Sequence, residues 1–390
     1  MQEFTIKMKI KIVLSSSLLL LSSGAYALDL VEAYQRAQST DPNWQAKLLQ
    51  YEAEQLDLGI AKGNLLPTIT LSGNVTRKSQ QTNSNLDTDL PFNSDLLMSS
   101  SSTTRQIALT ARQPLFRWDA WEALKQVKTS LSLSEINLQL QQQEHILNVA
   151  ETYFAVLRQQ SLTKANVQEE QALLKQLDMM NAKLREGLVA KSDVSEAKAQ
   201  YENARANRIA THVELILAQE QLAQFIGPYR ENLAVLSTDF QFQKPYPENL
   251  SAWTDLAQSQ NLSIQQARLQ QRYAQDQKRV EKAASYPQIE AVGSYGYTKQ
   301  SPQNIISSDG QFDQIGIEMN WNIYSGGRTQ KSVQKAAVNV EKSTAQLDAA
   351  MRKANTDVKK AYLQVETDQA KLQARKAAMD SSQIVSQASK

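Results

Sequence analysis

Two patterns of hydrophobic and polar positions alternate along this chain. In the stretches 69–76, 107–112 and 315–323, apolar residues tend to occupy every second position, which predicts β-strands with one apolar face. In residues 194–225, apolar and small residues recur at spacings of three and four, which predicts a helix with a coiled-coil seam. Residues 118–184 contain no proline and no glycine, so we expect another long helix there. The patterns therefore predict a mainly α protein with a small amount of sheet.

The last alternating stretch shows two distinct faces. Its apolar face consists of Ile315, Ile317, Met319, Trp321 and Ile323, and its other face consists of Gly316, Glu318, Asn320 and Asn322. Such alternation is typical of a half-buried sheet and also of the wall of a membrane barrel. A run of about 9–11 residues also fits a tilted membrane strand. If these strands lie in a membrane, the lipid-facing candidates are Ile315, Ile317, Met319 and Ile323.

The sequence predicts four strands, two in each half of the chain. Four strands cannot close a barrel, because closure takes at least about eight. An open sheet edge inside lipid would leave backbone groups without hydrogen-bond partners. A membrane location for these strands therefore requires several copies of the chain to share one barrel.

The predicted helices are long and narrow. As a helix, residues 118–184 would extend about 100 Å. The seam of the following helix contains small and polar residues that permit close approach of a neighbour: Val194, Ala197, Tyr201, Ala204, Arg208, Thr211, Leu215, Ala218, Leu222 and Phe225. Helices of this kind, rich in Gln and Ala, suit the wall of a tube better than a globular core.

One short stretch, "LREGLVAKSDV" (184–194), interrupts these two helices. Gly187 has the position of a C′ residue that ends the first helix. Asp193, with Glu196 three residues later, has the spacing of a capping box that starts the second helix, and Ser192 is an alternative N-cap. The stretch is either an ordinary helical turn or a functional tip that exposes two apolar residues, Leu188 and Val189.

The two halves of the chain are related by an internal repeat. Residues 51–75 align with 271–295 without a gap, which places Lys62 over Lys282 and Pro67 over Pro287. Further on, Tyr153 corresponds to Tyr362. We therefore divide the chain into a signal peptide (1–27), a first repeat (28–226), a linker (227–250) and a second repeat (251–390) that ends before its own helical tip.

The N-terminus has the layout of a secretory signal. Basic residues precede the apolar run Ile12–Leu21, and small residues surround a cleavage site after Ala27. Removing residues 1–27 lowers the net charge from +2 to about zero, because it takes away three lysines and one glutamate. No basic block remains, so nucleic acid is not an expected partner.

Residues suited to catalysis or metal binding are scarce. The chain has no cysteine and only two histidines, His145 and His212, which lie far apart within predicted helices. The segment "SGGR" (325–328) lacks the Lys-Ser/Thr of a phosphate-binding loop, and its position suits a turn between a strand and a helix. We therefore expect no enzyme activity, no metal site and no cofactor.

The order and duplication of these segments resemble the TolC family of outer-membrane efflux and secretion channels. The resemblance covers residues 28–390 and is carried by "LLPTITLSG", "ARQPLFRWDAWEAL", "AETYFAVL", "LREGLVAKSDVSEAKAQYENARAN" and "IYSGGRTQKSVQKA". It implies a homotrimer with a 12-stranded β-barrel in outer-membrane lipid, four strands per chain, and a periplasmic tunnel of α-helical hairpins. It also implies export of drugs, toxic small molecules or proteins together with an inner-membrane transporter and a periplasmic adaptor protein.

The resemblance also assigns roles to the bend. In the family this turn is the periplasmic tip of the tunnel, so Gly187, Leu188 and Val189 become candidates for adaptor contact, and Asp193 becomes a gate candidate. The gate residues that the family carries in its second tip have no counterpart here, because the sequence ends first. The competing function is a periplasmic coiled-coil adaptor or scaffold, which would have one hairpin and no duplicated strand pairs.

Overall fold

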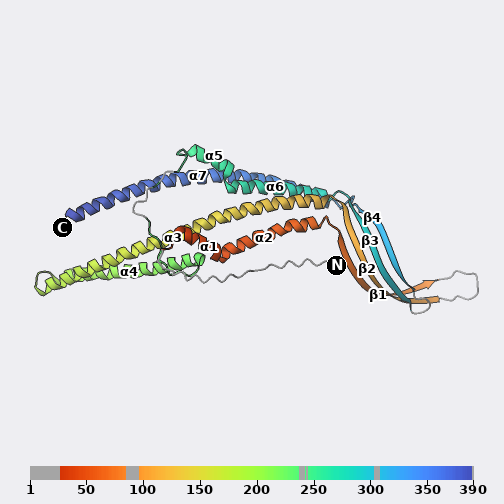
Figure 1. Ribbon diagram of the computed structural model, residues 1–390, viewed down its shortest axis with the longest axis horizontal. Coiled ribbons are helices and arrows are strands. Elements are labelled where there is room, and N and C mark those ends of the chain that lie inside the picture. The colour runs from red at the N-terminus through yellow and green to blue at the C-terminus, as the bar shows by residue number, and fades with distance from the viewer. Residues whose placement is uncertain (1–26, 85–95, 237–241, 243–244, 303–307, 389–390) are drawn as a thin grey trace, which may run out of the picture. The chain divides into compact units, whose positions relative to one another are not determined.

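The computed structural model describes residues 27–84, 96–236, 242, 245–302 and 308–388. The expected signal peptide therefore lies outside the described residues, apart from its last residue. Within them the chain forms seven helices and four strands, which Figure 1 labels in chain order. These elements are α1 (Leu30–Thr40), α2 (Pro42–Gly63), β1 (Thr68–Ser84), β2 (Leu96–Arg117), α3 (Trp118–Arg185), α4 (Lys191–Ile226), α5 (Leu250–Gln260), α6 (Leu262–Ala283), β3 (Gln288–Pro302), β4 (Ser308–Asn320) and α7 (Arg328–Ala388).

The repeat read from the sequence has a counterpart in the helices. Both α1 and α5 have 11 residues, and both α2 and α6 have 22. The N-cap of α1, Asp29, accepts a hydrogen bond from the backbone of Glu32, and the N-cap of α5, Asn249, accepts one from Ala252. The boundaries between the first repeat (28–226), the linker (227–250) and the second repeat (251–390) stay a prediction.

The four strands form one antiparallel sheet in the order β1-β2-β3-β4, as Figure 1 shows. The pairing register places Ile69, Ala111, Gly293 and Ile315 in one row across the sheet. The prediction of four strands within a mainly helical chain is thus confirmed. Among the described strands, β1 and β4 are edges, and each has one neighbour.

Strand β4 ends earlier than the alternation of its residues predicts. Its last residue, Asn320, pairs with Gln288, the first residue of β3, and Pro287 precedes that residue. Proline has no backbone N–H to extend the pairing, so the segment after Asn320 has no partner on β3. The prediction that Ile323 is a strand residue is therefore wrong, although its side chain is exposed.

The long helices match the sequence pattern. Helix α3 has 68 residues, which corresponds to about 100 Å at the rise of an α-helix. None of the ten seam residues expected on α4 is exposed, and Ala197, Ala204, Ala218 and Leu222 are buried. Arg208 of α4 forms an ion pair with Glu170 of α3 at 2.9 Å. The predicted coiled-coil seam is therefore present. No helix in the described part of the chain is long and apolar enough to cross a membrane.

The described residues form two compact units. One holds the residues up to Pro42 and those between Ile146 and Phe240. Its core joins α1, the middle of α3 and the end of α4 through Leu28, Ala33, Ala37, Val149, Tyr153, Val156, Leu157, Ala218, Leu222, Ile226 and Leu233. The buried Tyr153 hydroxyl lies 2.9 Å from the Leu28 carbonyl oxygen and 3.0 Å from that of Ala234.

The second unit holds residues 43–145 and those from 241 onward, including the sheet. Its α3 and α6 meet through polar side chains. Thr129 donates a hydrogen bond to the buried Asp276 at 2.6 Å, and Gln266 donates one to Asn137, also at 2.6 Å. Polar contacts of this kind suit helices that stand in water on both sides of a wall.

Candidate functional site

The sheet has one face that is apolar and exposed. Ile315 and Ile317 of β4 are 91% and 71% exposed, and Met319 follows on the same face. Ile69 and Leu71 of β1 are exposed in the same way. Exposed apolar residues in a continuous patch indicate contact with lipid or with another protein. Ile315, Ile317 and Met319 therefore share one exposed face of β4, as the alternation predicts, and their contact with lipid stays a prediction.

On strand β3 the height of this apolar face fits a membrane, whereas β4 carries Asp313 on the same face, opposite Tyr295. On β3 it runs from Ile289, opposite Met319, to Tyr297, opposite Ile107. The eight steps between these two residues of the strand span about 27 Å. The apolar band of membrane β-barrels is about 25 Å tall.

Aromatic residues lie where this face meets the helices. Phe116, which pairs with Ile289, stacks on Trp118 with ring centroids 6.5 Å apart. Trp118 also meets Tyr286 edge-on and has the ammonium of Lys125 5.4 Å from its ring centroid. Trp118, Trp121 and Trp321 are all exposed, so they are not core residues of the described chain. Aromatic residues next to an apolar strand face, with a basic group beside them, are the side chains expected at a membrane–water interface.

The tip between α3 and α4 begins as the sequence predicts. Gly187 has φ +71°. Its N–H donates to the Leu184 carbonyl at 3.0 Å, and the Leu188 N–H donates to the Lys183 carbonyl at 2.9 Å. These two bonds form a Schellman motif with Gly187 at C′. A Cβ atom there would meet no other atom within 4 Å, although the positive φ would strain any side chain.

The second half of the tip differs from the prediction. The N-cap of α4 is Ala190, not Ser192 or Asp193, because the helix begins at Lys191. Asp193 is the third helical residue, and its carboxylate accepts a hydrogen bond from the Ala190 N–H at 3.0 Å. Alanine has no side-chain acceptor, so only this half of a capping box forms.

The apolar residues of the tip are exposed to different degrees. Leu188 is 71% exposed, as expected. Val189 is only half-buried and does not share that full exposure. The projecting apolar group of the described tip is therefore mainly Leu188.

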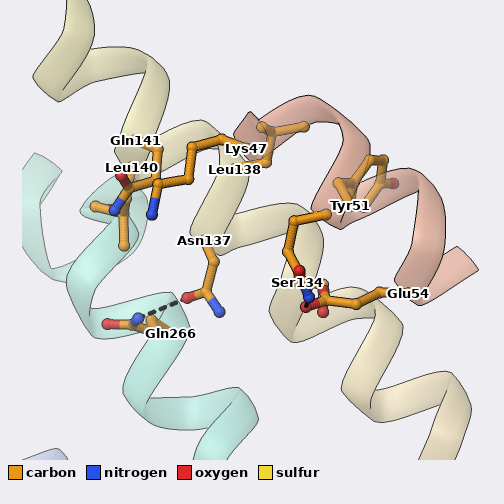
Figure 2. A pocket seen from close by; sticks show the side chains of 10 residues that line it. Lys47, Tyr51, Glu54, Ser134, Asn137, Leu138, Leu140, Gln141 and Gln266 are labelled. Carbon is orange, nitrogen blue, oxygen red and sulfur yellow. Dashed lines mark hydrogen bonds between the residues drawn. The ribbon is translucent and has the colours of Figure 1, made fainter. Parts of the chain in front are cut away.

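Residues of α2, α3 and α6 line a groove, which Figure 2 shows. Its volume is about 390 Å³. In it, Gln266 donates its hydrogen bond to Asn137. Hydrogen bonds from Gln50 and Ser134 lower the pKa of the Glu54 carboxyl. The other lining residues are Lys47, Tyr51, Leu138, Leu140 and Gln141. Amides, hydroxyls, one carboxylate, one ammonium and two leucines line this gap between helices, and no histidine is among its lining residues.

Groups that could hold a metal are not found in the part of the chain that the structure describes. No cluster of three or more His, Asp or Glu side chains comes together there. His145 lies instead against Trp44, with ring centroids 5.2 Å apart and nearly parallel planes. The features that remain as functional candidates are the apolar face of the sheet and the helical tip.

Comparison with known proteins decides what these features belong to. The sequence matches the family described as outer membrane efflux protein over residues 33–228 and 253–390, which is most of the chain. The chain belongs to this family. As an outer membrane efflux protein it is a channel protein of the outer membrane with a large periplasmic portion.

Relatives and solved structures agree with this assignment. The outer membrane protein TolC of Escherichia coli (strain K12) is 28% identical over 389 residues, which cover 97% of this chain and 76% of TolC. The alkaline protease secretion protein AprF of Pseudomonas aeruginosa is 28% identical over 374 residues, covering 94% of this chain and 76% of AprF. The Campylobacter jejuni CmeC outer membrane channel shares the fold, with a TM-score of 0.71 and 17% identity over 88% of this chain and 74% of CmeC.

These findings separate the two functions that the sequence left open. A periplasmic adaptor or scaffold does not account for the four-stranded sheet or for the family match. That alternative is therefore set aside.

One set of side chains on the polar face escaped the sequence reasoning. Arg112 of β2 bonds Glu318 of β4 across the intervening strand β3. Alternation alone places both residues on a polar face, but it does not give the register that brings them together. The relative order of the strands was the missing information.

Proposed function

We propose that three copies of this chain form the exit duct of an envelope export system, with one shared β-barrel of twelve strands and a periplasmic tunnel of helices. The observation that carries this proposal is the sheet itself. Its apolar face is exposed, and both of its edges lack a partner strand within the described chain. In lipid, unpaired edges leave backbone groups without hydrogen bonds, so other copies must supply the missing strands.

The exported cargo is proposed from the relatives. The similarity to TolC and to the alkaline protease secretion protein AprF supports export of small toxic compounds, of proteins, or of both. An inner-membrane transporter supplies the energy, because this chain has no nucleotide-binding loop. The partners are therefore such a transporter, a periplasmic adaptor and two further copies of the chain.

The tip between α3 and α4 is the proposed docking point for the adaptor. Gly187 leaves space for close approach of a partner backbone, and Leu188 projects an apolar side chain beside it. Val189 contributes less because it is half-buried. Asp193 is the gate candidate, although its carboxylate already caps Ala190 within the tip.

A pair of substitutions tests this function at the tip. Gly187→Trp in the full-length protein should leave assembly and membrane insertion normal and abolish drug efflux, because the indole occupies the space a partner needs. Gly187→Ala is the matched control, since it has the same strain from the positive φ without the bulk. Drug susceptibility of cells that depend on this channel is the readout.

The expected pattern is loss of efflux with tryptophan and retention with alanine. Changes in an adaptor hairpin that make room for the indole should restore export. If both variants export drugs as well as the parent does, or if alanine is as damaging as tryptophan, the tip is only a turn and does not dock a partner.

A further inference from the structure

Five charged side chains form a continuous series of ion pairs on the polar face of the sheet. We name Asp119, Arg117, Glu290, Arg112 and Glu318 the charge ladder. Arg117 lies 2.8 Å from Asp119 and 3.2 Å from Glu290. Arg112 lies 3.6 Å from Glu290 and 2.8 Å from Glu318. The ladder therefore runs from the first turn of α3 across β2 and β3 to the edge strand β4.

The pairing register fixes the face on which the ladder lies. Glu290 is directly opposite Glu318, and Arg112 is opposite Val292. Between these rows lies the row of Ala291 and Ile317, which faces the other way. The ladder is therefore on the face opposite the apolar residues proposed to meet lipid.

Stability does not explain this arrangement. Two glutamates directly opposite each other on neighbouring strands repel, and Arg112 compensates for only part of that. The side chains of Arg112 and Glu318 remain 45% and 57% exposed, and exposed ion pairs contribute little to stability.

The ladder carries more negative than positive charge. It contains three carboxylates and two guanidinium groups, an excess of one negative charge per chain. Hydrogen bonds from Arg117 lower the pKa of Asp119, so this carboxylate stays charged near neutral pH. Rings of acidic side chains favour cations in channels.

We propose that the charge ladder is a selectivity ring of the duct, located where the barrel ends and the helices begin, that favours cations and hinders anions. The proposal rests on the proposed function, because only a closed barrel turns the polar face into a lumen. Three copies of the ladder then encircle the pathway with an excess of three negative charges. Glu318 and Arg112 are the two most exposed members of the ladder, so they have the largest effect on its preference for cations.

Two substitutions that break the same ion pair distinguish selectivity from a structural role. Glu318→Gln removes the excess charge, so the ratio of K⁺ to Cl⁻ permeability should fall. Arg112→Gln leaves two excess carboxylates per chain, so the same ratio should rise. We expect changes of about twofold at 0.1 M salt, where the screening length is about 10 Å, and smaller changes at 1 M. The measurement is the reversal potential of the full-length protein in planar lipid bilayers under a KCl gradient.

The matched control is Asp313→Asn on the same strand. Asp313 pairs with Tyr295 and lies on the outer face, so its charge should not enter the lumen. It should leave the permeability ratio unchanged. Opposite shifts for Glu318→Gln and Arg112→Gln support the ring. The proposal is wrong if the permeability ratio of both variants changes in the same direction. It is also wrong if the parent protein conducts and neither variant changes the ratio. If the parent protein forms no conducting channel at all, the proposed function fails first.

Discussion

At the scale of single residues, two tyrosines show how the repeat is held together. The Tyr153 hydroxyl of α3 reaches the Leu28 carbonyl, two residues before α1 begins. The Tyr362 hydroxyl of α7 donates to the Glu248 carbonyl, two residues before α5 begins. The two positions correspond in the sequence repeat, so the same contact occurs in each half. They differ in burial, because Tyr153 is buried and Tyr362 is only half-buried.

This difference predicts unequal costs of removing the hydroxyl. Tyr153→Phe should lower the free energy of unfolding by about 1–2 kcal/mol, because the buried hydroxyl is lost and the half-buried Ala234 carbonyl loses a donor. Tyr362→Phe should cost at most about 0.5 kcal/mol, because water can replace the hydroxyl there. Urea unfolding followed by circular dichroism measures both values. Equal losses would mean that burial does not control the strength of this contact.

Single-residue predictions from the sequence succeeded where backbone geometry alone was decisive. Gly187 was identifiable because a positive φ at a helix C-terminus favours glycine. The N-cap of α4 was not, because Asp193 can act either as the cap or as the third residue, and helix starts differ by only a few positions. The contact between Arg112 and Glu318 depends on strand order, which no local pattern contains.

At the scale of elements, substitutions in strand β4 test which face of the sheet meets lipid. Ile315→Arg places a charge on the apolar face and should obstruct membrane insertion at a cost of about 2–4 kcal/mol, because Ile315 pairs with Gly293, midway between Ile289 and Tyr297. Gln314→Arg is the matched control, because Gln314 pairs with Ser294 on the polar face. It should insert normally. Separation of outer-membrane and soluble fractions measures insertion, and equal defects in the two variants would show that the assigned faces are wrong.

Elements were predicted with different success for a physical reason. The helices of 68 and 36 residues were readable because nothing in their sequence breaks a helix. Three strands were readable from the alternation within 69–76, 107–112 and 315–323, and β3 was readable from the repeat that aligns residues 271–295 with 51–75. The end of β4 could not be predicted in this way. It is set by Gln288, the first residue of β3 that pairs with β4, and not by the residues of β4 itself. Pairing, unlike periodicity, is a property of two segments at once.

At the scale of the whole molecule, the central claim is that the sheet is completed by other copies of the chain. Within one chain, β1 and β4 are separated by two strands, which places them about 14 Å apart. A disulfide requires Cα atoms closer than about 7 Å. A cysteine on β1 and a cysteine on β4 of the same chain therefore cannot form a disulfide with each other. The native chain contains no cysteine, so no background thiol interferes.

The most direct measurement is oxidative cross-linking of the two edges in outer membranes. A cysteine replaces Gln314 on β4, and a second is placed in turn at Thr68, Thr70 or Ser72 on β1, all on the polar face. At the position where the edges of neighbouring copies meet, the account predicts covalent dimers and trimers on a denaturing gel, with no larger species. Membrane-inserted protein that stays monomeric at every position would contradict the account.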